Sequence, residues 1–458
     1  MKRFLLFAMF SALLSILIGC GGTGSSQPST NPSPTAAVFI TGEDAPLPSV
    51  LAFNVTVNSI TLNNSSTSVS VLSTPTTVDF ARLLGLRTLL GFNSVPPGTY
   101  TSATINLSAP LISYLDLTTT PPSVGTINGT LTNSTVTVAF SQPLVVGSNG
   151  LAGLHMEFDL RQSLQADGTG QVTGVVNPQI DLKPVMASDP DAQITDLRGG
   201  LVSVNVAGSS FVIQRPGGHQ VTIVVNSQTR FNGSWNLSNM APPAFVEVDG
   251  TVQADGGVLA SGVEVLATTH AFLSGRIVNV NPSIGPAQAI TLLVGEEMPD
   301  IPSLPGGFPV TLDVSQVTYY QVCFFDNWFT NVLFNNSSLV VGQRVFVGGT
   351  FDSTSNTFVP QKISLRRQGV EGDLVQGSVN IISGNRGSFQ LQNNLLVGYL
   401  LSGPLTVQTG NVTLFVNVNG LAGLQSGGAM KLRVHGLMLK DSMTGKPQLW
   451  AGRVRVLP

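Results

Sequence analysis

The sequence VEVDGT at residues 246–251 is the pattern that decides the fold of this chain. Apolar and polar residues alternate in it, which is the period of a β-strand with one buried face. The pattern returns as RVFVGGT at residues 344–350 and as KLRVHG at residues 431–436. Three copies predict tandem units of one β-rich kind.

Each copy lies in a longer unit with an opening strand and a closing strand. The opening strands are GLVSV at 200–204, SGRIV at 274–278 and QGSV at 376–379, and the closing strands are LASGVEV at 259–265, a second at 359–365 and WAGRVRV at 450–456. We expect units at residues 199–268, 269–370 and 371–458, the second with an insert near residues 296–309. Five or six short strands per unit are typical of a small closed barrel, such as an OB-like one.

The segment before these units predicts a separate β-sandwich domain at residues 37–186, followed by a linker at 187–198. Its expected strands lie near residues 38–40, 53–57, 68–71, 103–107, 135–140, 155–160 and 180–185. One helix is predicted at residues 80–90, where the leucines can share a face with Phe80. Asp79 could cap its start and Gly91 could end it. The expected fold class is therefore all-β.

Composition agrees with this class and excludes others. Charged residues are 10% of the 458 residues, against a usual figure of about 25%. Hydrophobic residues at 42% exclude general disorder, and the net charge of −3 provides no basic footprint for nucleic acid. Glycine (49) and proline (28) are plentiful, as in proteins of short strands and tight turns.

The amino terminus has the order of an export signal. Lys2 and Arg3 precede an apolar run at residues 4–18, and Gly19 and Cys20 follow it. The run is shorter than the roughly 20 residues of a membrane-spanning helix. Its end resembles the bacterial lipobox. The resemblance implies cleavage between Gly19 and Cys20, and a lipoprotein held on the membrane by lipid, including palmitate, on Cys20.

The stretch after Cys20 predicts how the protein is attached. Residues 20–36 carry no charge and are rich in Gly, Ser, Thr and Pro, as in a flexible tether. No acidic residue directly follows Cys20, so the outer membrane of the cell envelope is favoured if the source has two membranes. With Cys20 lipidated, Cys323 is left alone, and no intrachain disulfide can form.

The domain at 37–186 resembles a family known mainly as a domain of unknown function in bacterial lipoproteins. The resemblance is carried, in order, by TGEDAP at 41–46, the strand at 53–62, VDFARLL at 78–84, PGTY at 97–100, EFD at 157–159 and LKPV at 182–185. It implies a transthyretin-type β-sandwich and no assigned activity. The unit at 199–268 resembles a second family of unknown function, found in tandem in exported proteins; the later units match it more loosely.

Motifs of catalysis are missing from the sequence. It has no G-x-S-x-G elbow, H-E-x-x-H helix, Walker A loop or paired C-x-x-C. The four histidines, at 155, 219, 270 and 435, are expected at edges or turns. We expect no catalytic residue, no metal and no cofactor.

Three groups of carboxylates leave alternatives open. Glu157 and Asp159 are two apart on one strand and point to the same face, where they could bind a cation, act on a substrate or simply face solvent. The pairs at 43–44 and at 189 and 191 offer oxygen ligands for calcium but lack the spacing of a recognised loop.

The densest aromatic cluster lies at residues 319–329 and surrounds Cys323. One interpretation is a surface that stacks on sugar or peptide, with Tyr319, Tyr320, Phe325 and Trp328 as its residues. The other is a plug in the core or between domains. Cys323 is expected to be a buried small hydrophobic residue.

These observations favour a non-enzymatic binding or scaffolding lipoprotein of the cell envelope. Its partners would be the membrane, through Cys20, and an envelope polysaccharide, peptidoglycan or protein, but not nucleic acid. Two alternatives remain. One is a carboxylate-based glycan hydrolase, which would need two carboxyl groups about 5 to 10 Å apart in a pocket. The other is a purely structural stalk.

Overall fold

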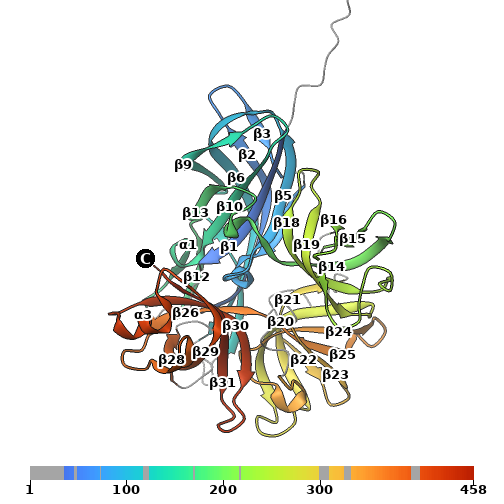
Figure 1. Cartoon of the computed structure of the whole chain (residues 1–458), viewed down its shortest axis with the longest axis vertical. Helices are drawn as coiled ribbons and strands as arrows, with labels where there is room; N and C mark the ends of the chain where they lie inside the picture. Colours follow the sequence, from blue (N-terminus) through green and yellow to red (C-terminus); the bar gives the residue numbers. More distant parts are fainter. Residues whose placement is uncertain are drawn as a thin grey trace, which may run out of the picture. The chain divides into compact units, whose positions relative to one another are not determined.

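In the residues that the structure describes, strands predominate and the helices are short turns (Figure 1). The computed structural model describes residues 36–45, 49–72, 74–116, 123–168, 171–215, 218–298, 309–323, 332–393 and 403–457. Residues Pro34–Pro458 form one compact unit. The prediction of an all-β protein is confirmed. No helix in the described part of the chain is long and apolar enough to cross a membrane.

The first domain consists of two larger sheets and one small one. Its strands are β1 (Ala36–Ala45), β2 (Val50–Asn63), β3 (Ser68–Ser70), β4 (Thr76–Asp79), β5 (Thr88–Val95), β6 (Gly98–Asp116), β7 (Ser123–Asn128), β8 (Thr130–Leu131), β9 (Thr135–Val146), β10 (Leu151–Asp159), β11 (Leu164–Ala166), β12 (Val172–Val176) and β13 (Ile180–Val185). One sheet has the order β13-β10-β1-β5, and the other has β3-β2-β6-β7 with β4 on β2 and β9 on β6. A third joins β11, β12 and β8.

Alternating side chains of both larger sheets build one core. On β2, Phe53, Val55 and Val57 are buried, as the alternation in the sequence predicts. The Phe158 ring of β10 lies 5.2 Å from that of Phe53 and 5.0 Å from that of Phe80. Burying one such side chain contributes about 1.5–3 kcal/mol.

The predicted helix at residues 80–90 is wrong beyond its first turn. Only the 3₁₀ helix η1 (Phe80–Leu83) forms, and Gly85, with φ +68°, redirects the chain after it. Leu89, Leu90 and Gly91 belong to β5, which pairs with β1. Leu89 and Leu90, which suited a helix face, are instead buried in a sheet, because pairing with β1 overrides local helix propensity. Asp79 makes no cap hydrogen bond.

Three barrel units follow. Their strands are β14 (Ile194–Asn205), β15 (Ser210–Gln214), β16 (Gln220–Val224), β17 (Arg230–Phe231), β18 (Phe245–Val252) and β19 (Val258–Ala267) in the first; β20 (Ala271–Asn281), β21 (Ala289–Met298), β22 (Pro309–Asp313), β23 (Tyr319–Val322), β24 (Arg344–Asp352) and β25 (Thr357–Leu365) in the second; and β26 (Gln368–Leu374), β27 (Asn380–Ser383), β28 (Arg386–Asn393), β29 (Leu405–Val416), β30 (Lys431–Lys440) and β31 (Pro447–Val456) in the third. The short helices are α1 (Leu160–Ser163), η2 (Pro190–Ala192), η4 (Asn336–Ser338) and α3 (Gly420–Ser426).

The strand order of these units is that of a five-stranded Greek-key barrel. The first unit runs β15-β14-β18-β19 and is closed by β16, which pairs with β15 and, in parallel, with β19. The third runs β28-β26-β30-β31 and is closed by β29 in the same way. In the second, β22-β21-β20-β24-β25 has the same order, and β25 pairs in parallel with β23. Strand order thus agrees with OB-type barrels.

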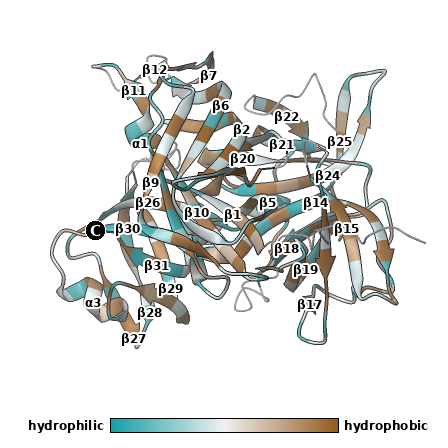
Figure 2. Cartoon of the chain, turned by 90° about the horizontal axis from the view of Figure 1, so that it is seen from above, coloured by the Kyte–Doolittle hydropathy of each residue, from teal (hydrophilic) through white to brown (hydrophobic). Residues whose placement is uncertain are grey.

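Two boundaries differ from the expectations. β14 begins at Ile194, inside the segment expected to be a linker at 187–198. The third barrel opens with β26, whereas the expected opening strand at 376–379 lies in the turn after it. β26 follows β25 after only two residues, so the second and third barrels have no separate linker between them. The cores follow the alternation visible as brown and teal segments along the strands in Figure 2.

The repeated glycine of the three barrels has one structural cause. Gly250, Gly349 and Gly436 lie on β18, β24 and β30, each at a β-bulge. There the register shifts against the last strand of the same barrel, which is β19, β25 or β31. A β-carbon at any of them would overlap a backbone carbonyl oxygen of the facing strand. The close approach of two backbones therefore requires a glycine at this position of the motif.

We expect Gly436→Ala to lower the thermal unfolding midpoint, because its β-carbon would overlap the Trp450 carbonyl oxygen and force the strands apart. Overpacking of this kind costs about 1–3 kcal/mol. Gly428→Ala is the matched control in the same barrel, since open space surrounds that position. Equal midpoints for the two variants would contradict the bulge interpretation.

Candidate functional site

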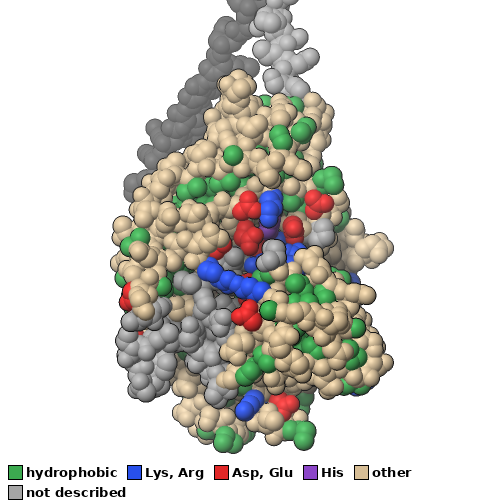
Figure 3. Space-filling model, turned by 90° about the vertical axis from the view of Figure 1, so that its left-hand side faces the viewer, with side chains coloured by type: hydrophobic (Ala, Val, Ile, Leu, Met, Phe, Trp, Pro, Cys, Tyr) green, Lys and Arg blue, Asp and Glu red, His purple; other side chains and the backbone are tan. Residues whose placement is uncertain are grey.

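The charged side chains of this chain gather where its domains meet. On the face shown in Figure 3, most acidic and basic groups and one histidine lie in a central area, surrounded by neutral and apolar side chains. Several ion pairs join charged residues of different domains, and the side chains in these pairs are largely buried. In a chain with 10% charged residues, this is a marked concentration.

Asp196 of β14 is the centre of the first part of this junction. Its side chain is 0% exposed and is paired with Arg82 of the first domain, with Arg198 of its own strand at 3.4 Å, and with Arg344 of the second barrel at 3.1 Å. Burial alone would raise the pKa of Asp196, but Arg198, Arg344 and Arg82 hold it well below its usual range. Three structural parts thus share one buried carboxylate.

Further arginine–carboxylate pairs extend this cluster across the first two barrels. Arg366, just after β25, is fully buried and pairs with Glu247 of β18 at 2.6 Å and Glu264 of β19 at 2.9 Å. Glu296 of β21 joins Arg198 at 2.6 Å and Arg82 at 2.8 Å. Buried charges are tolerated only when paired in this way.

A second part of the junction connects the first domain to the third barrel. Arg433 of β30 contacts Glu43 of β1 at 2.9 Å, Glu371 of β26 at 3.4 Å and Glu157 of β10 at 3.5 Å. Glu43 and Glu157 lie opposite one another in the parallel pairing of β1 and β10. The positive charge of Arg433 is therefore shared by two carboxylates that strand pairing places side by side.

His155 lies beside this group in an arrangement that superficially resembles a catalytic triad. Its Nδ1 is 3.2 Å from the Thr41 hydroxyl, and its Nε2 is 3.7 Å from a Glu43 oxygen. Burial lowers the pKa of His155, so the ring is neutral at physiological pH. Thr41 has no exposed surface, so its hydroxyl cannot reach a substrate. The arrangement is suited to orienting side chains at a domain contact.

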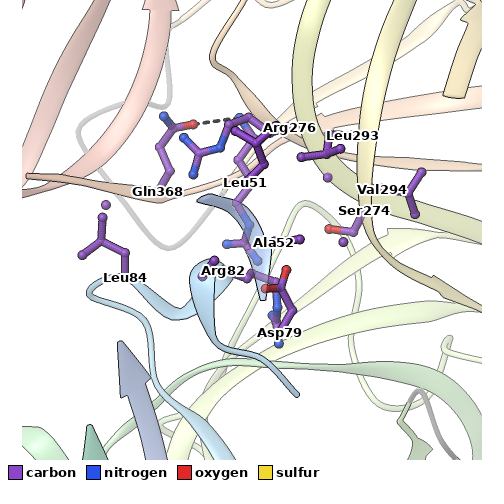
Figure 4. A pocket seen from close by; sticks show the side chains of 15 residues that line it. Leu51, Ala52, Asp79, Arg82, Leu84, Ser274, Arg276, Leu293, Val294 and Gln368 are labelled. Atoms are coloured by element: carbon purple, nitrogen blue, oxygen red, sulfur yellow. Dashed lines mark hydrogen bonds between the residues drawn. The ribbon is translucent and has the colours of Figure 1, made fainter. Parts of the chain in front are cut away.

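A small void lies next to the Asp196 cluster (Figure 4). Its lining includes Asp79, Arg82, Ser274, Arg276 and Gln368, which come from the first domain and from the second and third barrels. The void has a volume of about 30 Å³. This is enough for roughly two water molecules and too little for a sugar or a cofactor.

Asp79 at this void is held in an unusual environment. Its Oδ1 accepts a hydrogen bond from the backbone N–H of Phe53 at 2.9 Å. Burial raises the pKa of Asp79 to about 6, against the opposing effects of that hydrogen bond and of Arg82. The residue that the sequence suggested as a helix cap is therefore a buried carboxyl group at a domain contact.

The other sequence-derived candidates are distributed as follows. Asp159 does not act with Glu157: it caps α1 by accepting from the Gln162 N–H at 3.0 Å. Asp189 accepts from the Met186 N–H at 2.8 Å, and Asp191 is 3.7 Å from Arg455. In the described part of the chain, no three or more His, Cys, Asp or Glu residues are grouped to hold a metal ion.

Two of the four histidines differ from the expectation of edge or turn positions. His155 and His435 lie within the strands β10 and β30, and burial lowers the pKa of both. Only His219 and His270 lie in turns. The sequence does not indicate these buried strand positions. The carboxylate that approaches His155, for example, belongs to another strand and is distant in the chain.

The two tyrosines of the proposed ligand surface do not share one face. Tyr319 is 55% exposed, with the Lys362 ammonium 4.6 Å from its ring centre. Tyr320 points the other way, and its ring lies 5.8 Å from that of Phe334 in the core. Phe325 and Trp328 lie outside the described residues, as do Gly19 and Cys20. Cys323 is free and buried, as expected.

A cleft of about 360 Å³ lies between the first domain and the first barrel. One wall comes from β5 and the segment before β4. The other comes from the β15–β16 turn, from β16 and from the β18–β19 turn. No sequence pattern indicates this cleft, because its walls are about a hundred residues or more apart in the chain.

Two parts of the chain match known families. Residues 35–175 match the model of a domain of unknown function, DUF4382. Residues 199–264 match a second domain of unknown function, DUF5666. The two resemblances seen in the sequence are confirmed in that order, and neither family assigns an activity.

Comparison with individual proteins adds little. No curated protein matches the chain. Among solved structures, it is similar to one described as Drosophila Unr CSD456, at 10% identity and a TM-score of 0.14, covering 58% of this chain and 98% of that one.

We expect Asp196→Asn to lower the unfolding midpoint strongly, because three arginines lose their shared counter-charge. Breaking a buried pair costs about 3–5 kcal/mol. Asp181→Asn is the control: its partner Lys183 lies 3.0 Å away, both side chains are 55% exposed, and such a pair contributes about 0–1 kcal/mol. A small effect of Asp196→Asn in thermal unfolding would refute the central role of the junction.

Asp79 predicts a pH dependence of stability. Its folded pKa of about 6 lies above the ordinary value of 3.8, so its contribution is complete below pH 3.8 and is lost as pH rises through about 6. Between these pH values the free energy of unfolding of the wild type should fall by up to about 3 kcal/mol more than that of Asp79→Asn. The unfolding midpoint of the variant should therefore depend less on pH. Asp352→Asn should leave the pH dependence over this range unchanged, since hydrogen bonds from Ser355 and Thr354 lower the pKa of Asp352. Parallel profiles for wild type and Asp79→Asn would argue against a raised pKa.

Proposed function

We propose that this protein is a non-catalytic binding or scaffolding lipoprotein of the cell envelope, held on a membrane by lipid on Cys20. The anchor rests on the sequence: an apolar export signal ends at Gly19 and Cys20, and an uncharged tether follows. If the source has two membranes, the outer one is favoured. The partner would be an envelope polysaccharide, peptidoglycan or protein.

The observation that carries the scaffolding role is the shared burial of Asp196. The first domain, the first barrel and the second barrel each contribute a charged side chain to it. A hinge between these parts would separate buried opposite charges, which is costly. The domains are therefore suited to act as one rigid body, and a rigid body on a tether keeps a bound partner at a defined distance from the membrane.

The use of the carboxylates also favours a non-catalytic role. Glu43 and Glu157, which face each other across β1 and β10, both contact Arg433. An ion pair with arginine engages the carboxylate oxygens that an acid or base catalyst would present to its substrate. Their charges are used to hold the third barrel against the first domain.

The anchor is tested by Cys20→Ser in cells of the source or of a bacterial host. We expect the variant to leave the membrane fraction or to keep its signal segment, because the sulfur that receives the lipid is gone. Cys323→Ala is the control, since that cysteine is buried and should not affect partitioning. Normal processing and unchanged membrane partitioning of Cys20→Ser would overturn the proposal.

A further inference from the structure

The cleft between the first domain and the first barrel has the dimensions of a ligand site. Its volume of about 360 Å³ lies within the range of about 300–1,000 Å³ that is usual for small-ligand pockets. Its walls are formed by β5, by β16 and by described residues next to these strands and next to β4 and β19. The chemistry of its lining indicates which class of molecule it could take.

Arg215 determines the charge that the cleft favours. Its Nη1 donates to the Leu89 carbonyl at 2.6 Å and its Nη2 to the Thr88 hydroxyl at 3.5 Å. Within the described ranges, no carboxylate lies at ion-pair distance from it, unlike Arg82, Arg344 or Arg366. Burial lowers the pKa of Arg215 to about 10, so it remains charged at neutral pH. A held guanidinium without a counter-ion suits a carboxylate ligand.

Neutral polar groups make up much of the remaining lining. His219 spans the cleft: one ring nitrogen is 3.1 Å from the Thr74 hydroxyl, and Nε2 donates to the Pro75 carbonyl at 3.2 Å. Thr222 on β16 is exposed. At the rim, Asp255 accepts from the Gly257 N–H at 3.0 Å through Oδ1, which leaves Oδ2 for a ligand hydroxyl. These groups suit a ligand with several hydroxyls.

Phe92 on β5 adds an apolar surface. Its side chain is half-buried and lines the cleft opposite the barrel. Gly256 lies against its ring: a β-carbon there would be 2.7 Å from Cε1, and φ is +86°. A glycine is therefore required for the turn to approach the ring. The C–H face of a sugar ring packs well on such an aromatic surface.

We propose that this cleft binds an acidic saccharide, with the uronic-acid carboxylate on Arg215, hydroxyls on Thr222 and Asp255, and the sugar ring against Phe92. The inference rests on the proposed non-catalytic binding role and names its ligand class. It requires no bond to form or break. The volume fits roughly one or two sugar units, so a chain end or a short segment of polysaccharide would be bound.

The test is calorimetric titration of the detergent-solubilised full-length protein with D-glucuronate, D-galacturonate and their short oligomers. Methyl esters of the same sugars and D-glucose are the neutral comparisons. We expect saturable 1:1 binding of at least one uronate, and affinity about 10- to 100-fold weaker for its methyl ester, because a charge-assisted hydrogen bond is lost.

Variants locate the site. Arg215→Met should weaken uronate binding by about 10- to 100-fold, while Arg230→Met, on the exposed β17 of the same barrel, should not change it. If Arg215→Met does not fold, Thr222→Val on the exposed face of β16 provides the second measurement, with an expected loss of about threefold or more. No uronate binding by the folded wild type, equal affinity for uronate and ester, tighter binding of an acidic peptide, or unchanged affinity in these variants would overturn the inference.

The result is independent of the anchor. Uronate binding with a Cys20→Ser protein that stays in the membrane would overturn the proposed anchoring alone. A membrane-released Cys20→Ser protein and no uronate binding would overturn the cleft inference alone.

Discussion

Pairing of buried opposite charges between domains is the constraint on which this structure depends. Asp196 is completely buried, yet it remains ionised because Arg82, Arg198 and Arg344 surround it. An isolated carboxylate in that position would be very costly, whereas the assembled cluster makes each domain contact depend on the others. Separating the domains would break these ion pairs, which agrees with the domains forming one compact unit.

The barrels contribute a second constraint, at the level of the backbone. On β18, β24 and β30, a glycine accommodates a bulge against the last strand of the barrel, at positions 250, 349 and 436. The bulge bends the strand, as closure of a small barrel requires. In the first barrel the residues directly before this glycine also supply charges, since Glu247 and Asp249 both face the junction. One short motif thus serves closure of the barrel and attachment to its neighbours.

Concentrating charge at the junction has a consequence for binding. The cleft is lined by neutral polar groups, the Phe92 ring, the Arg215 guanidinium and, at its rim, the Asp255 carboxylate, and it is distinct from the paired charges around Asp196. Rigid walls keep such a cleft preformed, which reduces the entropy lost on binding. The same ion pairs that fix the domains therefore also fix the two walls of the proposed ligand site.

Local sequence was enough to identify most strands and the repeats, because the alternation of apolar and polar residues is expressed within a few consecutive residues. It failed at residues 80–90, where leucines with helical spacing enter β5 through pairing with β1. It was also silent on the junction and the cleft. Asp196 and Arg344 are 148 residues apart, and Glu43 and Arg433 are 390 apart. Such pairs carry no periodic signal, so only the packing of the complete chain establishes which charges meet and which remain free for a ligand.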